Sequence, residues 1–265
     1  MPITDVFDKL MAPTPSGGEG DLGPKMTLME HLIELRGRMI KMALALVITT
    51  ALSFTFTDYL INILTAPLSG GREALQAIDV TENIGVWMRV SLMSGVVLAM
   101  PVLVYQILGF VVPGLTRAER RYLWIVVPGA SALFVVGVAF CYFIMLPVAV
   151  PFLISFLNIP TKPRPSTYIG FVTNLMFWIG LAFETPMILY FLSWVGLISP
   201  QFLVKQRKYA ILLNAIIAAA ITPTTDPINM TLVMAPLVIL YEVGVVLSRV
   251  AYRQRHKPKL DADRK

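Results

Sequence analysis

The stretch VWMRVSLMSGVVLAMPVLVYQILGFVV, from Val86 to Val112, carries one charged side chain, Arg89. An α-helix needs about 20 largely apolar residues to cross the roughly 30 Å of hydrocarbon in a bilayer. This stretch exceeds that length, and its Gln106 can serve as an interhelical hydrogen-bonding residue. It therefore predicts a membrane-spanning helix and sets the class of the whole chain.

Further apolar runs lie on both sides of this stretch. The long ones are Met39–Phe56, Tyr122–Leu146 and Tyr168–Val195. Two shorter ones follow, Tyr209–Ile221 and Met230–Leu247. We predict an all-α membrane protein with six transmembrane helices, of which the last two are short. Run lengths alone leave open four spans followed by a re-entrant hairpin.

The composition supports this class and excludes others. Of the 265 residues, 56% are hydrophobic and 14% are charged, whereas soluble domains have about 45–50% apolar and about 25% charged residues. The single cysteine, Cys141, lies in an apolar run, so neither a disulfide framework nor a thiolate metal site is expected. We expect no cofactor, no metal and no enzymatic activity. His31 and His256 are expected to be surface residues.

The positions of the basic residues predict the orientation. Of the 22 lysines and arginines, 18 fall in residues 1–41, 117–121, 205–208 and 249–265. Basic residues are enriched in cytoplasmic segments, so both termini are expected in the cytoplasm. The net charge of +6 then reflects membrane orientation rather than binding to nucleic acid.

This topology divides the chain into three parts. Residues 1–25 are expected to be a disordered cytoplasmic tail, because they are rich in Pro, Gly and charged residues. Residues 26–248 form the membrane domain, and residues 249–265 form a basic cytoplasmic tail. The loop Asp58–Gly85 is long enough for a small cap on the outer face. Prolines recur in the apolar runs and predict bent helices around a concavity.

Two glutamates precede the first span. Thr27 and Glu30 fit a capping box, which gives Glu30 a structural role. Glu34 pairs with Arg38 four residues later, but it is repelled by Glu30 four residues earlier, and each effect is about 0.2–0.5 kcal/mol. The two effects cancel, so helix stability does not explain Glu34. We consider it a candidate for receiving an external cation.

Other acidic residues have separate interpretations. Glu119 completes a second capping box with Thr116, and its carboxylate can still accept further hydrogen bonds. Glu184 lies deep in the fourth run, where an ionised carboxylate needs a partner, a cavity or a proton. We expect it at a polar, water-accessible spot on the concave face. Asp226 is expected to cap the turn between the short runs, and Glu242 lies late in the last span.

Several segments in this order resemble the TatC family, the multispanning receptor subunit of the twin-arginine protein translocase. They are HLIELRGR (His31–Arg38), SGVVLAMPVLVYQILGFVVPGLTRAERR (Ser94–Arg121), FETP (Phe183–Pro186) and AAITPTTDPIN…APLVILYE (Ala219–Glu242). APL (Ala66–Leu68) also resembles the family. One departure is Thr224-Thr225, where many relatives have a shorter, proline-rich turn.

The resemblance implies a concave, glove-shaped bundle of six helices in the prokaryotic cytoplasmic membrane. It implies signal-peptide arginine binding by Glu34 and Glu119, and an intramembrane polar site at Glu184. Supporting positions of the cytoplasmic site are Arg36, Phe110, Pro113, Leu115 and Arg121; other motif positions are Pro67, Asp226 and Glu242. The implied partners are twin-arginine signal peptides of folded cargo, single-span subunits of the TatA and TatB type, the lipid bilayer, and further copies of the chain in a receptor complex.

The resemblance also implies export of folded proteins driven by the proton motive force. A different class remains as an alternative, a proton-coupled carrier of small solutes that uses Glu184. Carriers often have interrupted helices at matching positions of two repeated halves. In this sequence the short runs are consecutive and no internal repeat is apparent, which favours the translocase.

Overall fold

The computed structural model describes residues 28–111, 123–155, 162–222 and 227–256, and their regular elements are all helical. The first half contains α2 (Leu28–Ser53), η1 (Phe54–Phe56), α3 (Thr57–Thr65), η2 (Gly71–Ala74) and α4 (Glu82–Val111). Next come α6 (Leu123–Phe140), the π-helical turn η4 (Cys141–Met145) and α7 (Leu146–Ser155). The rest comprises α8 (Pro165–Phe183), α9 (Thr185–Val195), α10 (Pro200–Lys205), α11 (Arg207–Ile221) and α12 (Pro227–His256).

Five helical segments of the described residues are long and apolar enough to cross a membrane. They are Met29–Thr65, Glu82–Phe110, Val126–Ser155, Pro165–Val195 and Asn229–Arg253. They confirm an all-helical, multi-pass membrane architecture. The predicted fifth span corresponds to α11, whose 15 residues extend about 22 Å. Its length does not establish a full crossing.

The expectation of a short final helix is wrong. Helix α12 has 30 residues and continues past Leu247, where the apolar run ends, to His256. The apolar run measures only the part of a helix suited to hydrocarbon. The residues that follow, SRVAYRQRH, include no glycine or proline to end the helix. Residues 249–256 of the predicted tail are therefore a continuation of the membrane helix.

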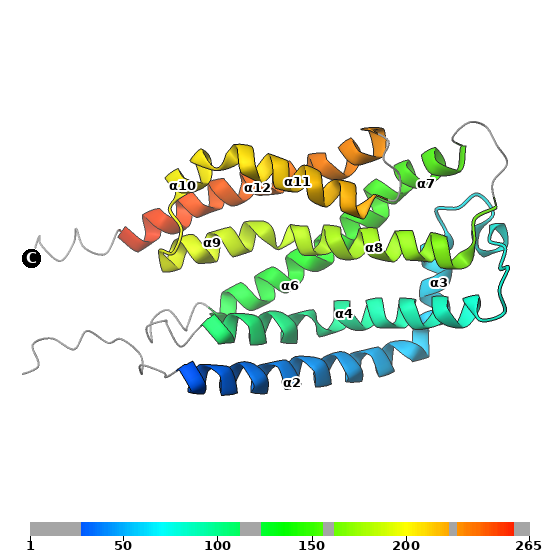
Figure 1. Ribbon diagram of the computed structural model, residues 1–265, viewed down its shortest axis with the longest axis horizontal. Coiled ribbons are helices and arrows are strands. Elements are labelled where there is room, and N and C mark those ends of the chain that lie inside the picture. Colours follow the sequence, from blue (N-terminus) through cyan, green and yellow to red (C-terminus); the bar gives the residue numbers. More distant parts are fainter. Residues whose placement is uncertain (1–27, 112–122, 156–161, 223–226, 257–265) are drawn as a thin grey trace, which may run out of the picture.

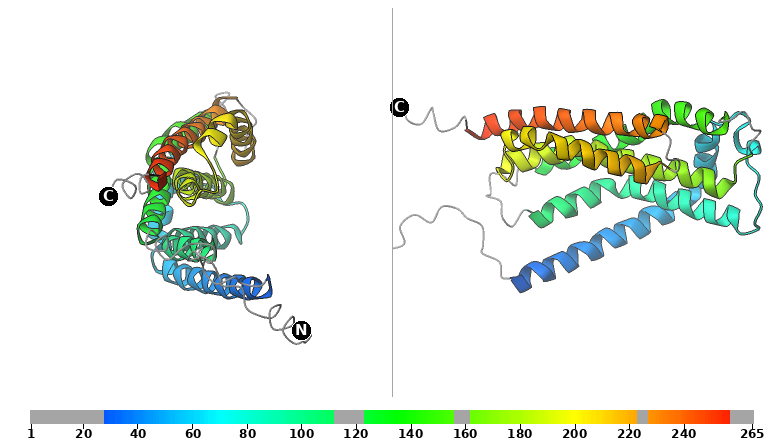
Figure 2. Two further views of the ribbon diagram at one scale, coloured as in Figure 1. Left: turned by 90° about the vertical axis from the view of Figure 1, so that its left-hand side faces the viewer. Right: turned by 45° about the horizontal axis from the view of Figure 1, so that its top comes forward.

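The two ends of the bundle differ (Figure 1). Helix α2 begins and α12 finishes at the same end, which we call the terminal end. Helix α3 and η2 lie at the opposite end, which we call the cap end. Figure 2 shows the helices in a curved arrangement, with α2 and α4 on one side, α11 and α12 on the other, and α8 on the inner side. This arrangement is the concavity expected from the sequence.

Prolines account for the irregular points in two spans. Pro186 has no N–H to donate to the carbonyl four residues earlier, and the helix breaks into α8 and α9 at Glu184. Pro147 follows the π-helical turn η4, in which the backbone hydrogen-bond spacing is lengthened. By contrast, α4 continues through Pro101 without an assigned break.

Helices α2 and α4 pack closely because of one glycine. A Cβ atom at Gly95 would lie 2.8 Å from the Cα atom of Thr50, so a larger residue would force the two backbones apart. The other faces of α2 expose large apolar side chains, namely Ile40, Leu44, Val47 and Leu52. In a bilayer these faces contact lipid or another helix.

The predicted cap on the loop between the first two spans is present at the cap end. Two tyrosine hydroxyls donate to carbonyls near the end of α3: Tyr142 to Ile63 at 3.0 Å and Tyr168 to Leu64 at 2.8 Å. Arg164 binds Asp79 at 2.8 Å and Glu82 at 3.4 Å. Hydrogen bonds to Glu82 and then Asp79 raise the pKa of the Arg164 guanidinium. This network joins the loop to the start of α8.

Candidate functional site

Glu34 lies near the terminal end on the face of α2 that meets α4. Arg38 donates from Nε and Nη2 to Oε1 of Glu34, at 3.0 and 2.5 Å. The Nη1 atom of Arg38 also points to Oε1 of Gln106 on α4, at 3.4 Å. Both members of the Glu34–Arg38 pair have 21% of their side-chain surface exposed. The acid therefore has an internal arginine on one of its two oxygens.

The second oxygen of Glu34 is in a different situation. Oε2 is buried and has no hydrogen-bond partner among the described residues. A buried acceptor without a donor costs roughly 1–3 kcal/mol, and more when it is charged. Glu34 can therefore gain free energy from a further donor that reaches it.

Gly109 allows Arg38 to lie against α4. A Cβ atom at this position would be 2.3 Å from Nη1 of Arg38, so a larger residue would require the guanidinium to shift. Gly109 thus leaves room for Arg38 in the position from which it approaches Gln106.

His31 lies one turn before Glu34, and its ring stacks on Phe110 with centroids 4.2 Å apart and an interplanar angle of 22°. Both residues are half-buried. The expectation that His31 is a plain surface residue is therefore wrong, because the end of α4 covers it. The stack joins α2 to the end of α4, and Glu119 follows nine residues after Phe110 in the sequence.

The other positions predicted for the arginine-binding site divide into two groups. Arg36 is exposed and forms no ion pair with a described residue. Glu119, Pro113, Leu115 and Arg121 lie outside the described residues, as does Asp226.

The side chain of Glu184 is buried and does not face solvent. The residue is 7% exposed, and its Oε1 atom has no hydrogen-bond partner among the described residues. The expected water-accessible position is therefore not what this structure shows. The break at Glu184 lies beside α12: a Cβ atom at Gly244 would be 3.3 Å from Cα of Pro186, and Ser193 shares a 2.6 Å hydrogen bond with Ser248.

Two other motif positions, Glu242 and Pro67, lie in other parts of the described chain. Glu242 of α12 accepts a 2.6 Å hydrogen bond from Nη2 of Arg207 at the start of α11. Next to it, the Tyr241 hydroxyl donates to the Leu203 carbonyl of α10 at 2.8 Å. Pro67 lies in the turn between α3 and η2. This turn is at the cap end, whereas α2, which carries Glu34, begins at the terminal end (Figure 1).

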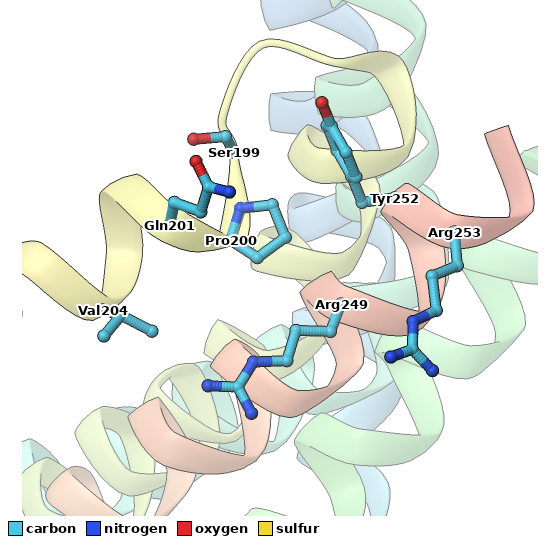
Figure 3. A pocket seen from close by; sticks show the side chains of 7 residues that line it. All are labelled: Ser199, Pro200, Gln201, Val204, Arg249, Tyr252 and Arg253. Atoms are coloured by element: carbon cyan, nitrogen blue, oxygen red, sulfur yellow. The ribbon is translucent and has the colours of Figure 1, made fainter. Parts of the chain in front are cut away.

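A basic pocket lies between α10 and α12 at the terminal end (Figure 3). It is about 390 Å³ in volume, and Arg249 and Arg253 line its α12 side while Pro200, Gln201 and Val204 line its α10 side. Among the described residues, no carboxylate lines it. Its charge suits anions and disfavours an arginine ligand, so Glu34 is the better place for a cation at this end.

The described residues show no group of three or more His, Cys, Asp or Glu side chains that could hold a metal ion. The chemistry at the terminal end is instead that of a carboxylate held between two helices. Such a carboxylate can bind a guanidinium through charge-assisted hydrogen bonds.

Comparisons with known proteins agree with this picture. Residues 30–236 match the family model described as Sec-independent protein translocase protein (TatC). The chain is 39% identical over 226 residues to the Sec-independent protein translocase protein TatC of Carboxydothermus hydrogenoformans, covering 84% of this chain and 93% of the relative. It is 36% identical over 236 residues to TatCy of Bacillus subtilis, covering 88% and 92%.

A solved structure supports the same conclusion. The fold matches a crystal structure of the twin-arginine translocase receptor TatC with a TM-score of 0.75 and 36% identity, over 84% of this chain and 99% of that one. None of these similarities supports the solute-carrier alternative. The chain belongs to the TatC family of Sec-independent protein translocase proteins, which are multi-pass membrane proteins of the transport machinery.

Proposed function

We propose that this chain is the signal-peptide receptor and core subunit of a twin-arginine translocase in a prokaryotic cytoplasmic membrane. The observation that carries the proposal is the Glu34 carboxylate, one oxygen of which has no donor among the described residues. The terminal end then faces the cytoplasm, and α11 makes the sixth crossing through a thinned region of the bilayer. Folded cargo crosses with energy from the proton motive force.

Recognition of two arginines needs two acids. Glu34 receives one guanidinium, and Glu119, which follows Phe110 in the sequence, receives the other. Charge-assisted hydrogen bonds contribute about 1.5–3 kcal/mol each, so two contacts alone give modest affinity. The apolar part of the signal peptide supplies the rest by lying along exposed apolar helix faces.

Arg38 acts as an internal competitor for Glu34. An incoming arginine must share or replace the contacts that Arg38 makes to Oε1. Arg38 has a second acceptor within reach, Oε1 of Gln106 at 3.4 Å, so it can leave Glu34 without losing every partner. The exchange replaces an internal guanidinium with an external one, which keeps the site nearly charge-balanced.

Replacing Arg38 with glutamine is therefore expected to strengthen signal-peptide binding by about two- to five-fold. A partly exposed ion pair is worth about 0–1 kcal/mol, and the ligand no longer has to displace it. The measurement is a titration of a fluorescent twin-arginine signal peptide into purified protein. A loss of binding in R38Q, with unchanged thermal stability, would show that Arg38 holds Glu34 in place instead of competing for it.

The proposed partners follow from this role. Single-span subunits of the TatA and TatB type dock against the membrane helices, and Glu184 is proposed to take part in that docking or in proton coupling. The receptor complex contains several copies of the chain. No nucleic acid is involved.

The proposal is tested with two peptides that differ only in the recognition pair. We expect a twin-lysine peptide to bind at least ten-fold more weakly than the twin-arginine peptide, because lysine cannot make the bidentate contact of a guanidinium. A peptide with a shortened apolar region provides the control for membrane partitioning. Equal affinity for the two pairs would refute arginine recognition.

A further inference from the structure

Arg89 is a charged residue within a membrane-spanning segment. It lies on α4 inside the span Glu82–Phe110, and the residue is exposed. Charged side chains in spans are costly and are usually paired or face a functional cavity. No ion pair joins Arg89 to a carboxylate among the described residues. A different anionic group is therefore needed to balance its charge.

The guanidinium of Arg89 is held in a fixed orientation against α8. Nε donates to Oγ1 of Thr173 at 2.9 Å, and Nη2 donates to the Gly170 carbonyl at 3.2 Å. Thr173 is 3% exposed and in turn donates to the Ile169 carbonyl at 2.6 Å. A Cβ atom at Gly170 would lie 3.3 Å from Nη1, so the guanidinium rests directly on this glycine.

These two hydrogen bonds occupy one edge of the guanidinium, and the other edge can still donate to a ligand. The Nε and Nη2 edge faces α8, whereas the edge formed by Nη1 and Nη2 has no further acceptor among the described residues. That edge is the planar fork that binds phosphate or carboxylate oxygens in pairs.

Arg89 borders a cavity of about 620 Å³ between α2, α4 and α8. Thr50, Thr173 and Asn174 contribute polar groups to it. The other side chains are apolar and include Met88, Leu92, Met93, Val96 and Phe177. The cavity therefore suits a molecule with an anionic group at one point and an apolar chain beside it.

The depth of Arg89 in the bilayer brings it close to the lipid head groups. Helix α4 has 30 residues and is about 45 Å long, against about 30 Å of hydrocarbon. If it is centred, Arg89 lies a few Å inside the boundary, since it is about 10 Å from Glu82 along the axis. An arginine within a few Å of the boundary can be reached by the phosphate of a lipid head group while it keeps its contacts with α8.

We propose that this cavity binds one phospholipid of the leaflet at the cap end. The Nη1–Nη2 edge of Arg89 receives the phosphate, and an acyl chain lies over Met93, Val96 and Phe177. A phosphate is favoured over a carboxylate from another helix because the phosphate layer of the bilayer lies within a few Å of Arg89. The inference does not depend on the proposed receptor function.

Photolabelling tests the site directly. The protein is purified in detergent and exposed to phosphatidylglycerol that carries a diazirine in its acyl chain; labelled peptides are then identified by mass spectrometry. We expect labelling within residues 88–96 and 170–177. Diacylglycerol with the same diazirine chain, which lacks the phosphate, should label these peptides about ten-fold less, as expected for loss of one charge-assisted hydrogen-bond pair.

Variants separate the site from general charge effects. Arg89→Gln should reduce labelling by phosphatidylglycerol about ten-fold, whereas Arg72→Gln should leave it unchanged. Arg72 is exposed and belongs to the loop at the same cap end, where it lies 3.6 Å from Asp58. Thr173→Val keeps the charge of Arg89 but removes the acceptor for Nε, and it should give an intermediate loss even if R89Q does not fold.

Three results would overturn the proposal. The first is equal labelling of R89Q and the unaltered protein, or equal labelling by diacylglycerol. The second is full competition by millimolar inorganic phosphate, which would identify a soluble ligand. The third is complete protection by a co-purified single-span subunit, which would identify the cavity as a helix-docking site.

Discussion

Replacing Glu34 with glutamine is expected to weaken binding of a twin-arginine signal peptide by roughly ten- to one-hundred-fold. The change removes the negative charge that supports charge-assisted hydrogen bonds of about 1.5–3 kcal/mol. It keeps the shape of the side chain. Titration of a fluorescent signal peptide into purified protein measures the effect.

Glu30→Gln is the matched control for this variant. Glu30 lies one helical turn earlier on α2 and has the same charge, so any general loss of attraction for a cationic peptide should affect both variants equally. We expect E30Q to change the affinity less than three-fold, since a surface charge contributes about 0–1 kcal/mol. Similar losses in E30Q and E34Q would show that only the net charge matters.

Replacing Glu184 with leucine is expected to reduce transport at least ten-fold without lowering thermal stability. The carboxyl group is enclosed, and its Oε1 atom has no partner among the described residues. Such a group lowers stability, so an apolar side chain of similar size should leave the melting temperature unchanged or raise it. Export of a folded fluorescent reporter into membrane vesicles measures transport.

Two readouts distinguish a functional from a structural Glu184. Signal-peptide binding at Glu34 should persist in E184L, because the two acids lie on different helices and serve different steps. Transport at the full rate with unchanged complex size would contradict any role in docking or proton coupling. A collapse of both binding and melting temperature would mean that Glu184 supports the fold.

Hydropathy located the spans because it measures the property that the bilayer selects. The run from Val86 to Val112 predicted α4, which the structure bounds at Glu82 and Val111. Hydropathy did not predict the parts of a helix that lie outside the hydrocarbon, because side chains there need not be apolar. Helix α12 is the example, because it extends to His256. The third span also extends beyond Leu146, but there the added helix, which ends at Ser155 and contains Pro151, is itself apolar.

Only those contacts of the site that lie within one helix could be predicted from the sequence. Glu34 and Arg38 are four residues apart, so their pairing follows from the helix period. Gln106 and Phe110 come from another helix, and no pattern within α2 indicates that they meet Arg38 and His31. Gly109 gave a signal that could have been used, because a glycine at the end of a membrane helix permits a close approach.

Arg89 is a second residue whose contacts could not be predicted from the sequence. Its position in an apolar run was evident from the sequence, since Arg89 is the one charged residue between Val86 and Val112. Its anchoring by Thr173 and Gly170 depends on the packing of α4 against α8, more than 80 residues later in the chain. Only the folded chain shows which edge of the guanidinium is left for a ligand.

The most direct test of the central claim is a double-mutant cycle between Glu34 and one arginine of the signal peptide. Affinities are measured for the unaltered protein and E34Q, each with the twin-arginine peptide and with peptides in which either arginine is glutamine. If Glu34 binds an arginine, one peptide position should couple to it by about 1–3 kcal/mol, and the other should not. Strictly additive effects at both positions would contradict arginine recognition by Glu34.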